Sequence, residues 1–155
     1  MSIEKAADNI ELVSQLKQIL ASNKDKRIAV VGTTSTGKST FLRDIPEARD
    51  MDDLVFPKLS NEERDYVNRT PWTPEIGRTM IRLAKEKIKI EPGKPVFGTV
   101  VLDADLIVYL HISDTLLAQR AESRGVVFED AKNMQSQIKE EIEKSGIPFL
   151  EFQVG

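Results

Sequence analysis

The 155-residue chain has no cysteine, one histidine and one tryptophan. Without cysteine it can form no disulfide, thiolate metal site or cysteine nucleophile, and a single histidine leaves no zinc-ligand spacing. No run approaches the roughly eighteen apolar residues of a membrane-spanning helix, and the N-terminus lacks the charged-then-apolar order of a signal peptide. We therefore expect a cytoplasmic protein with no membrane partner.

A large positive charge is also missing. The formal net charge is −3 and no block is strongly basic, so extended contact with a nucleic-acid backbone is not indicated, although a local basic groove is compatible with this charge. Hydrophobic residues make up 40% of the chain, which suits one domain with one core at this length. We expect a single domain over residues 1–155, as a monomer or a homodimer.

The strongest motif lies in residues 26–41, where an apolar run, a glycine-rich turn and helix-compatible residues follow one another. Residues 32–39 fit G-x-x-x-x-G-K-[ST] at every fixed position and predict a P-loop. Glycine allows backbone angles at which successive N–H groups surround a polyphosphate. The predicted nucleotide-binding residues are Gly32, Thr33, Thr34, Ser35, Thr36, Gly37, Lys38, Ser39 and Thr40.

Two side chains of this loop have specific expected roles. Lys38 brings a mobile cation to the β- and γ-phosphates, and Ser39 offers a hydroxyl to Mg²⁺. The helix that begins near Lys38 adds the positive end of its dipole. A chance match is the alternative, and it would need both the spacing and the preceding strand to be accidental. The expected ligands are ATP and Mg²⁺.

Hydrophobic periodicity predicts an amphipathic helix over residues 3–21, within an N-terminal segment 1–22, ahead of a strand at Arg27–Val31. That helix either packs on its own domain or contacts a partner. The helix after the P-loop should be short, because Pro46 follows closely and proline rarely lies inside a helix.

Residues 47–56 are predicted to be a second strand or its end, and they carry carboxylates at Asp50, Asp52 and Asp53. On a strand Asp50 and Asp52 would point the same way, and the carboxyl ends of strands are where α/β sheets place ligand chemistry. Carboxylates there could hold Mg²⁺ through water and accept a proton from a substrate hydroxyl. The alternative is a solvated acidic turn, and we favour the functional interpretation.

Residues 57–74 are long for a plain connection and predict a substrate-binding or lid segment, with two helical turns at Asn61–Asn68. Trp72 either stacks on a planar substrate or fills the edge of the core. A helix is predicted over residues 74–89, and on it Arg78 either reaches a substrate anion or is solvated.

Two apolar runs, Val96–Leu102 and Leu106–Ile112, predict buried parallel strands. The residues between them are too few for a crossover between adjacent parallel strands. Either the first strand ends near Gly98 and residues 99–105 form a compressed connection, or the two strands are not neighbours. Asp103 has the look of a Walker B aspartate, but we favour a turn or cap because the same residue would have to begin the connection.

Residues 113–130 contain a predicted lid helix in which Arg120 and Arg124 lie one turn apart on one face. Such a pair can close over a transferring phosphoryl group, or it can simply stabilise the negative end of the helix dipole. A helix at Glu129–Lys144 and a strand at Ile147–Val154 complete the chain. We predict an α/β, three-layer P-loop NTPase fold, with a mainly parallel sheet of about five strands and helices on both faces.

Three stretches together resemble small P-loop kinases of the nucleoside monophosphate kinase superfamily: the P-loop, Asp50–Val55, and residues 105–124, which look like the strand and lid helix. Asp50-x-Asp52 is similar to the paired aspartates of shikimate kinases, which would place Asp50 near Mg²⁺ and Asp52 on the substrate hydroxyl. Asp52-Asp53 resembles the pair of polynucleotide 5′-hydroxyl kinases, one member of which is the general base.

The resemblance implies transfer of the γ-phosphoryl group of ATP to a hydroxyl or phosphate on a nucleotide, a nucleic acid or a small metabolite. The residues expected to act in catalysis are Lys38, Asp52, Asp53, Arg120 and Arg124. Those expected to contact the acceptor are Asp52, Trp72 and Arg78. Ser39 and Asp50 are expected to bind Mg²⁺.

Two other functional classes remain open. An ATPase or GTPase switch would need a convincing Walker B aspartate and a base-specificity motif such as Asn-Lys-x-Asp, which residues 23–26 do not supply. A nucleotide-binding module without catalysis would use its N-terminal helix to hold a partner. The acidic cluster and the paired arginines weakly disfavour such a module, and a kinase is the preferred prediction.

Overall fold

The computed structural model describes residues 3–33, 36–69 and 73–154, with the backbone alone described for residues 3–9. Its strands form one five-stranded parallel sheet in the order β2-β3-β1-β4-β5. The strands are β1 (Ile28–Val31), β2 (Arg49–Asp50), β3 (Val96–Gly98), β4 (Leu106–His111) and β5 (Phe149–Gln153). The predicted α/β fold and its five-stranded parallel sheet are confirmed.

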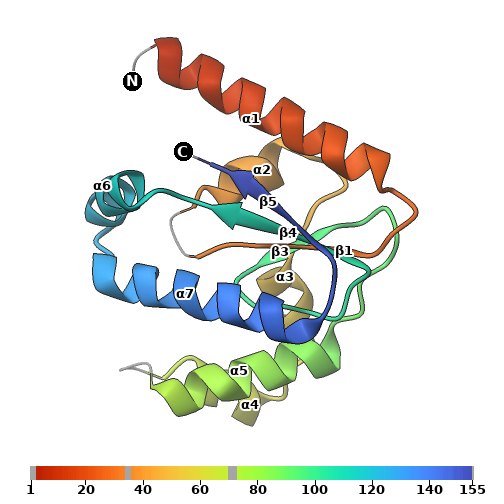
Figure 1. Ribbon diagram of the computed structural model, residues 1–155. Helices are drawn as coiled ribbons and strands as arrows, with labels where there is room; N and C mark the ends of the chain where they lie inside the picture. Colours follow the sequence, from red (N-terminus) through yellow and green to blue (C-terminus); the bar gives the residue numbers. More distant parts are fainter. Residues whose placement is uncertain (1–2, 34–35, 70–72, 155) are drawn as a thin grey trace.

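Helices cover both faces of this sheet and produce three layers (Figure 1). α1 and α2 lie on one side, whereas α3, α5 and α7 lie on the other. The helices are α1 (Ile3–Ser22), α2 (Lys38–Asp44), α3 (Met51–Val55), the 3₁₀ helix η1 (Phe56–Lys58), α4 (Asn61–Val67), α5 (Pro74–Lys87), α6 (Asp114–Arg124) and α7 (Phe128–Ser145). This arrangement is consistent with the three-layer P-loop-like fold that we predicted.

Each face of the sheet has its own apolar core, because side chains alternate along a strand. In β1, Val30 packs with Leu16 of α1 and Phe41 of α2. Its neighbour Val31 points to the opposite face and joins the cluster that contains Leu83 of α5. The central strands are therefore buried on both faces, which explains why they are continuous apolar runs in the sequence.

The short helix after β1 is also confirmed. α2 ends at Asp44, and Ile45 adopts an extended conformation, as expected of the residue before Pro46. The two helical turns predicted at Asn61–Asn68 correspond to α4, which begins with a capping box between Ser60 and Glu63.

The two possibilities for the compressed connection both apply. β3 ends at Gly98, and β1 lies between β3 and β4, so these two strands are not neighbours. The connection over residues 99–105 returns along the sheet without a helix, and its side chains Val100, Val101 and Leu102 are buried in the core on the α5 and α7 side. The sequence shows an apolar run here because the connection is buried, although only its first three residues are strand.

The second strand is shorter than predicted. β2 covers only Arg49–Asp50, and the chain then enters α3. The cause is local: a carboxylate oxygen of Asp50 accepts a hydrogen bond from the backbone N–H of Asp52 at 3.0 Å and caps the helix. The negative charges of Asp52 and Asp53 in the first turn further stabilise α3, because they lie at the positive end of the helix dipole. The expectation that Asp50 and Asp52 share one face of a strand is therefore wrong.

Asp103 lies at the amino end of the strands, whereas the P-loop lies at their carboxyl end. Its carboxylate, 86% exposed, pairs with Arg27 just before β1, and so does the carboxylate of Asp105. This confirms a turn position for Asp103 and excludes it as a Walker B residue.

In the described part of the chain, no helix is both long and apolar enough to cross a membrane.

Candidate functional site

The P-loop begins where β1 ends and leads directly into α2. Gly37 adopts φ = 93°, a left-handed conformation that favours glycine. Gly32 is tightly enclosed: its N–H donates to the carbonyl of Gly98 at 3.2 Å, and a Cβ there would lie 3.0 Å from the Cβ of Leu110. The backbone conformation therefore favours glycine at position 37, and the close packing against Leu110 favours it at position 32. Thr34 and Ser35, predicted to bind nucleotide, lie outside the described residues.

Gly37→Ala is expected to lower the free energy of unfolding by about 1–2 kcal/mol, because an L-residue in this left-handed conformation is strained. It should also weaken ATP binding about tenfold or more, a 1.4 kcal/mol effect or larger, because the added Cβ would lie 3.2 Å from a guanidinium nitrogen of Arg120. Urea unfolding and isothermal titration with ATP measure the two effects. Gly146→Ala is the matched control, since Gly146 has φ = 71° and open space around it. Equal ATP affinity in the two variants would contradict this role for Gly37.

Lys38 folds back over its own loop. Its ammonium donates to the carbonyl oxygens of Gly32 at 2.7 Å and Thr33 at 2.8 Å. The pKa of Lys38 is lowered to about 8, chiefly by burial and also by the charge of nearby Arg124, while Asp50 and Asp52 partly oppose the shift. The ammonium is thus a weakly solvated cation beside the loop, and an anionic ligand would favour its charged form.

Two threonine side chains predicted to bind nucleotide make bonds inside the protein instead. The buried hydroxyl of Thr33 donates to the carbonyl of Ala131 in α7 at 2.6 Å. The buried hydroxyl of Thr36 donates to the carbonyl of Thr33 at 2.9 Å. Their side chains therefore hold the shape of the loop and attach it to α7.

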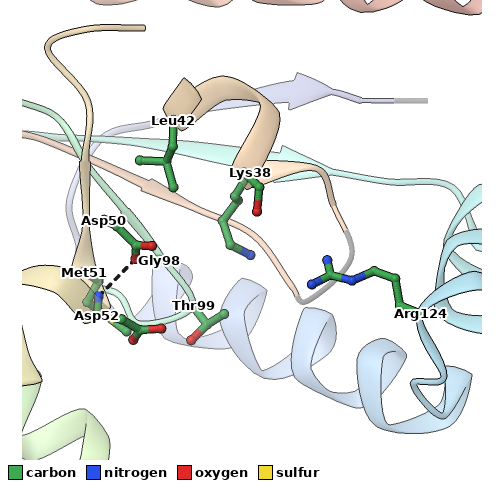
Figure 2. Close-up of a pocket in the computed structure, with 9 residues that line it drawn as sticks. Lys38, Leu42, Asp50, Met51, Asp52, Gly98, Thr99 and Arg124 are labelled. Carbon is green, nitrogen blue, oxygen red and sulfur yellow. Dashed lines mark hydrogen bonds between the residues drawn. The ribbon is translucent and has the colours of Figure 1, made fainter. Parts of the chain in front are cut away.

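A cavity of about 210 Å³ opens beside the P-loop at the carboxyl ends of the strands (Figure 2). Charged and hydroxyl side chains reach it from α2, β2, α3, the end of β3 and α6. Its lining residues are Lys38, Ser39, Leu42, Asp50, Met51, Asp52, Gly98, Thr99 and Arg124. The sheet order thus brings together groups that lie up to 86 positions apart, 124 minus 38, in the sequence.

The acidic cluster is divided by the cavity. Asp50 and Asp52 line it, whereas Asp53 is absent from the lining, although Asp52 and Asp53 are both exposed residues of α3. Burial raises the pKa of Asp52, and the negative charges of Asp50 and Asp53 raise it further. Met51, between the two lining aspartates, is buried against Gly98. A Cβ added to Gly98 would lie 2.8 Å from the Cβ of Met51. This close packing positions α3 and its carboxylates over the end of β3.

The two arginines of the lid helix occupy different places. Arg124, in the last turn of α6, lines the cavity, and in Figure 2 its guanidinium points toward Lys38. Arg120 instead donates to the carbonyl of Thr36 in the P-loop at 2.8 Å, and burial lowers the pKa of its guanidinium. Arg124 is thus placed to contact a ligand in the cavity, whereas Arg120 joins α6 to the P-loop backbone.

One predicted substrate residue is not brought into this site. Arg78 is exposed on α5 and does not line the cavity. Trp72 lies outside the described residues. Thr99 was not identified as a site residue from the sequence, yet it lines the cavity directly after β3. One of the two alternatives, that the strand ends near Gly98, would have placed Thr99 at the carboxyl end of a parallel strand, where ligand chemistry is expected.

Ser39 and Asp50 are the candidate ligands for Mg²⁺, and both line the cavity. One oxygen of Asp50 accepts the N–H of Asp52, and its carboxylate has a second oxygen. Among the described residues no group of three or more His, Cys, Asp or Glu could hold a metal ion. One carboxylate and one hydroxyl still fit Mg²⁺, which usually keeps several waters and takes further ligands from substrate phosphates.

Comparison with known proteins adds no relative: the chain matches no protein-family model and none of the curated proteins.

Proposed function

We propose that this protein is an ATP-dependent phosphotransferase that moves the γ-phosphoryl group to a hydroxyl or phosphate acceptor. The observation that carries the proposal is the cavity beside the P-loop, which Lys38 and Arg124 line together with Asp50 and Asp52. Cations for a phosphate and a carboxylate for an acceptor proton are the groups that phosphoryl transfer requires. The resemblance to small P-loop kinases supports the same proposal.

In this proposal the loop residues bind and the cavity residues act. Backbone N–H groups of the P-loop hold the phosphates, and Lys38 leaves its loop carbonyls to contact the β- and γ-phosphates. We assign little to the helix dipole, because α2 has only seven residues. Mg²⁺, held by Ser39 and Asp50, neutralises phosphate charge when it is bound. Arg124 stabilises the charge that develops on the transferring group.

Asp52 is the proposed general base. The pKa of Asp52 is raised above that of an ordinary aspartate and so lies closer to neutral pH. Such a pKa suits a general base, because the group must be ionised before the reaction and must accept a proton during it. It orients the acceptor hydroxyl in line and takes its proton, whereas Thr99 offers a hydroxyl on the same wall of the cavity. Positioning and charge neutralisation supply most of the rate.

The two rival classes have less support. A nucleotide switch commonly places a Walker B carboxylate on a strand beside β1. Here β3 ends at Gly98 and is followed by Thr99, and Asp103 lies at the amino end of the strands. A binding module without catalysis gives no reason for Asp52 and Arg124 to line one cavity. Each rival nevertheless predicts a distinct result in the experiment below.

The test is release of ADP from Mg·ATP, alone and with nucleosides, nucleoside monophosphates, 5′-hydroxyl oligonucleotides and shikimate-like acids. A kinase should release ADP at least about tenfold faster with its acceptor than without one, and phosphorylated acceptor should accumulate in equal amount. A switch should hydrolyse nucleotide without any acceptor. ATP binding with neither activity would replace this proposal with the binding module.

A further inference from the structure

A second cavity, of about 140 Å³, lies between α5 and α7 and beneath the chain that follows β3. Its wall is mainly apolar and includes Met80 and Ile81 from α5, Val100 from the connection, and Met134 and Ile138 from α7. It exists where residues 99–105 connect β3 to β4 without a helix. The connection has no helix that could cover this space between α5 and α7.

Thr99 connects the second cavity to the first. It lines both, and it is the only residue common to the two sets of described lining residues. Thr99 directly follows β3, and Figure 2 draws it below Lys38, on the same side of the site as Asp52. The two cavities therefore adjoin at Thr99, on the side of the site that carries the proposed base.

The volume fits one ring rather than two. An engineered apolar cavity of about 150 Å³ in another protein binds benzene. The second cavity is close to that size, so it accommodates a six-membered ring but is small for a fused purine. Methionine side chains adapt to flat rings and contact them favourably, and two of the four methionines of this chain line the cavity.

Polar groups at the cavity suggest which ring. Three exposed residues form its rim: Lys85 supplies donors, Glu141 supplies acceptors, and the amide of Gln137 supplies both. A hydrocarbon ring would form no hydrogen bonds with these rim groups, whereas a pyrimidine base has donors and acceptors around its edge. The lining includes no arginine fork for a ring carboxylate.

We propose that this second cavity holds the pyrimidine ring of a nucleoside or nucleotide acceptor, whose reacting oxygen extends past Thr99 to Asp52. This inference rests on the proposed function. In the transfer, the acceptor oxygen forms a bond to the γ-phosphorus as the bond from that phosphorus to its bridging oxygen breaks. ADP leaves with the electron pair, and the proton of an acceptor hydroxyl passes to Asp52.

The experiment uses ¹³C-methyl methionine as a probe of each cavity. Met80 and Met134 report the second cavity, and Met51 reports the first. Thymidine and deoxycytidine should shift the Met80 and Met134 signals, at concentrations at least about tenfold below those needed with deoxyguanosine or shikimate. ADP should act mainly on Met51. Pyrimidine binding without movement of Met80 and Met134, or a stronger response to shikimate or the purine, would overturn the inference.

Two variants test the same cavity by function. Ile81→Trp should fill it and raise the KM for the pyrimidine acceptor about tenfold or more, with the affinity for ATP unchanged. Gln137→Ala changes an exposed residue and should raise that KM about fivefold even if Ile81→Trp folds poorly. Ile10→Trp, at a position 71% exposed on α1, is the matched control and should change neither constant.

These results separate the two proposals. If pyrimidine nucleosides shift Met80 and Met134 but no phosphate is transferred, the binding site stands and the proposed function fails. If acceptor-dependent transfer occurs while these signals and both variants are unaffected, the kinase stands and the second cavity is not its acceptor site.

Discussion

Lys38→Met is expected to reduce kcat/KM for ATP about a hundred- to a thousandfold, which is typical for removal of one charged donor from a transition state. Methionine keeps the unbranched apolar stem of lysine, so the loop should retain its packing. What is lost is the ammonium that now bonds the carbonyls of Gly32 and Thr33 and that we place on the phosphates in the complex. Full activity of Lys38→Met with an established acceptor would refute the mechanism.

The pH dependence gives this prediction a second readout. Because the pKa of Lys38 is lowered to about 8, the ammonium is present below that pH and is lost as the pH rises through it. The kcat/KM for ATP, which reports groups of the free enzyme, should therefore fall above about pH 8. Bound phosphates favour the charged lysine, so the corresponding fall in kcat should occur at higher pH.

A matched lysine variant separates this effect from a general change of charge. Lys94→Met removes an exposed ammonium that pairs only with Glu91 among its described salt bridges. It should retain wild-type activity and the fall near pH 8, whereas the residual activity of Lys38→Met should lack that fall. Circular dichroism and urea unfolding establish that both variants are folded.

The parts of the fold that were predicted well are those whose apolar pattern has a single cause. β4 is a six-residue run buried on both faces, and its limits are evident in the sequence. The run Val96–Leu102 gave too long a strand, because apolar residues indicate burial and not strand pairing. The whole run is largely buried, but only Val96–Gly98 pair with β1. Likewise, the end of β2 depends on the cap made by Asp50, a side-chain choice that periodicity does not register.

The site was predictable to the extent that its chemistry is local. The P-loop spacing placed Lys38 and Ser39, since a few consecutive residues fix that turn. Helical spacing placed Arg120 and Arg124 on one face, but only the distance from α6 to the loop decides that Arg120 bonds Thr36 while Arg124 lines the cavity. Predicting Thr99 would have required the strand order as well, because its position at the cavity depends on β3 being the neighbour of β1.

Asp52→Asn is expected to lower kcat about a hundred- to ten-thousandfold with a hydroxyl acceptor, the usual contribution of a general base. Asparagine has nearly the same shape and can still bond the hydroxyl, but it cannot take the proton. ATP affinity should change little, because the P-loop and Lys38 are intact. Steady-state kinetics with the acceptor from the ADP-release panel, together with ATP titration, measure both quantities.

The neighbouring aspartates decide whether Asp52 is the base. In the wild type, activity should fall as the pH drops through the pKa of Asp52, which burial holds above that of an ordinary aspartate, and Asp52→Asn should remove this fall. Asp53→Asn should keep activity within about threefold and move the fall to lower pH, because the charge of Asp53 raises the pKa of Asp52. Asp103→Asn, at the amino end of the strands and away from the cavity, should leave the pH profile unchanged. A large loss of kcat in Asp53→Asn, with Asp52→Asn nearly normal, would instead assign the base to Asp53 and require α3 to turn in the complex.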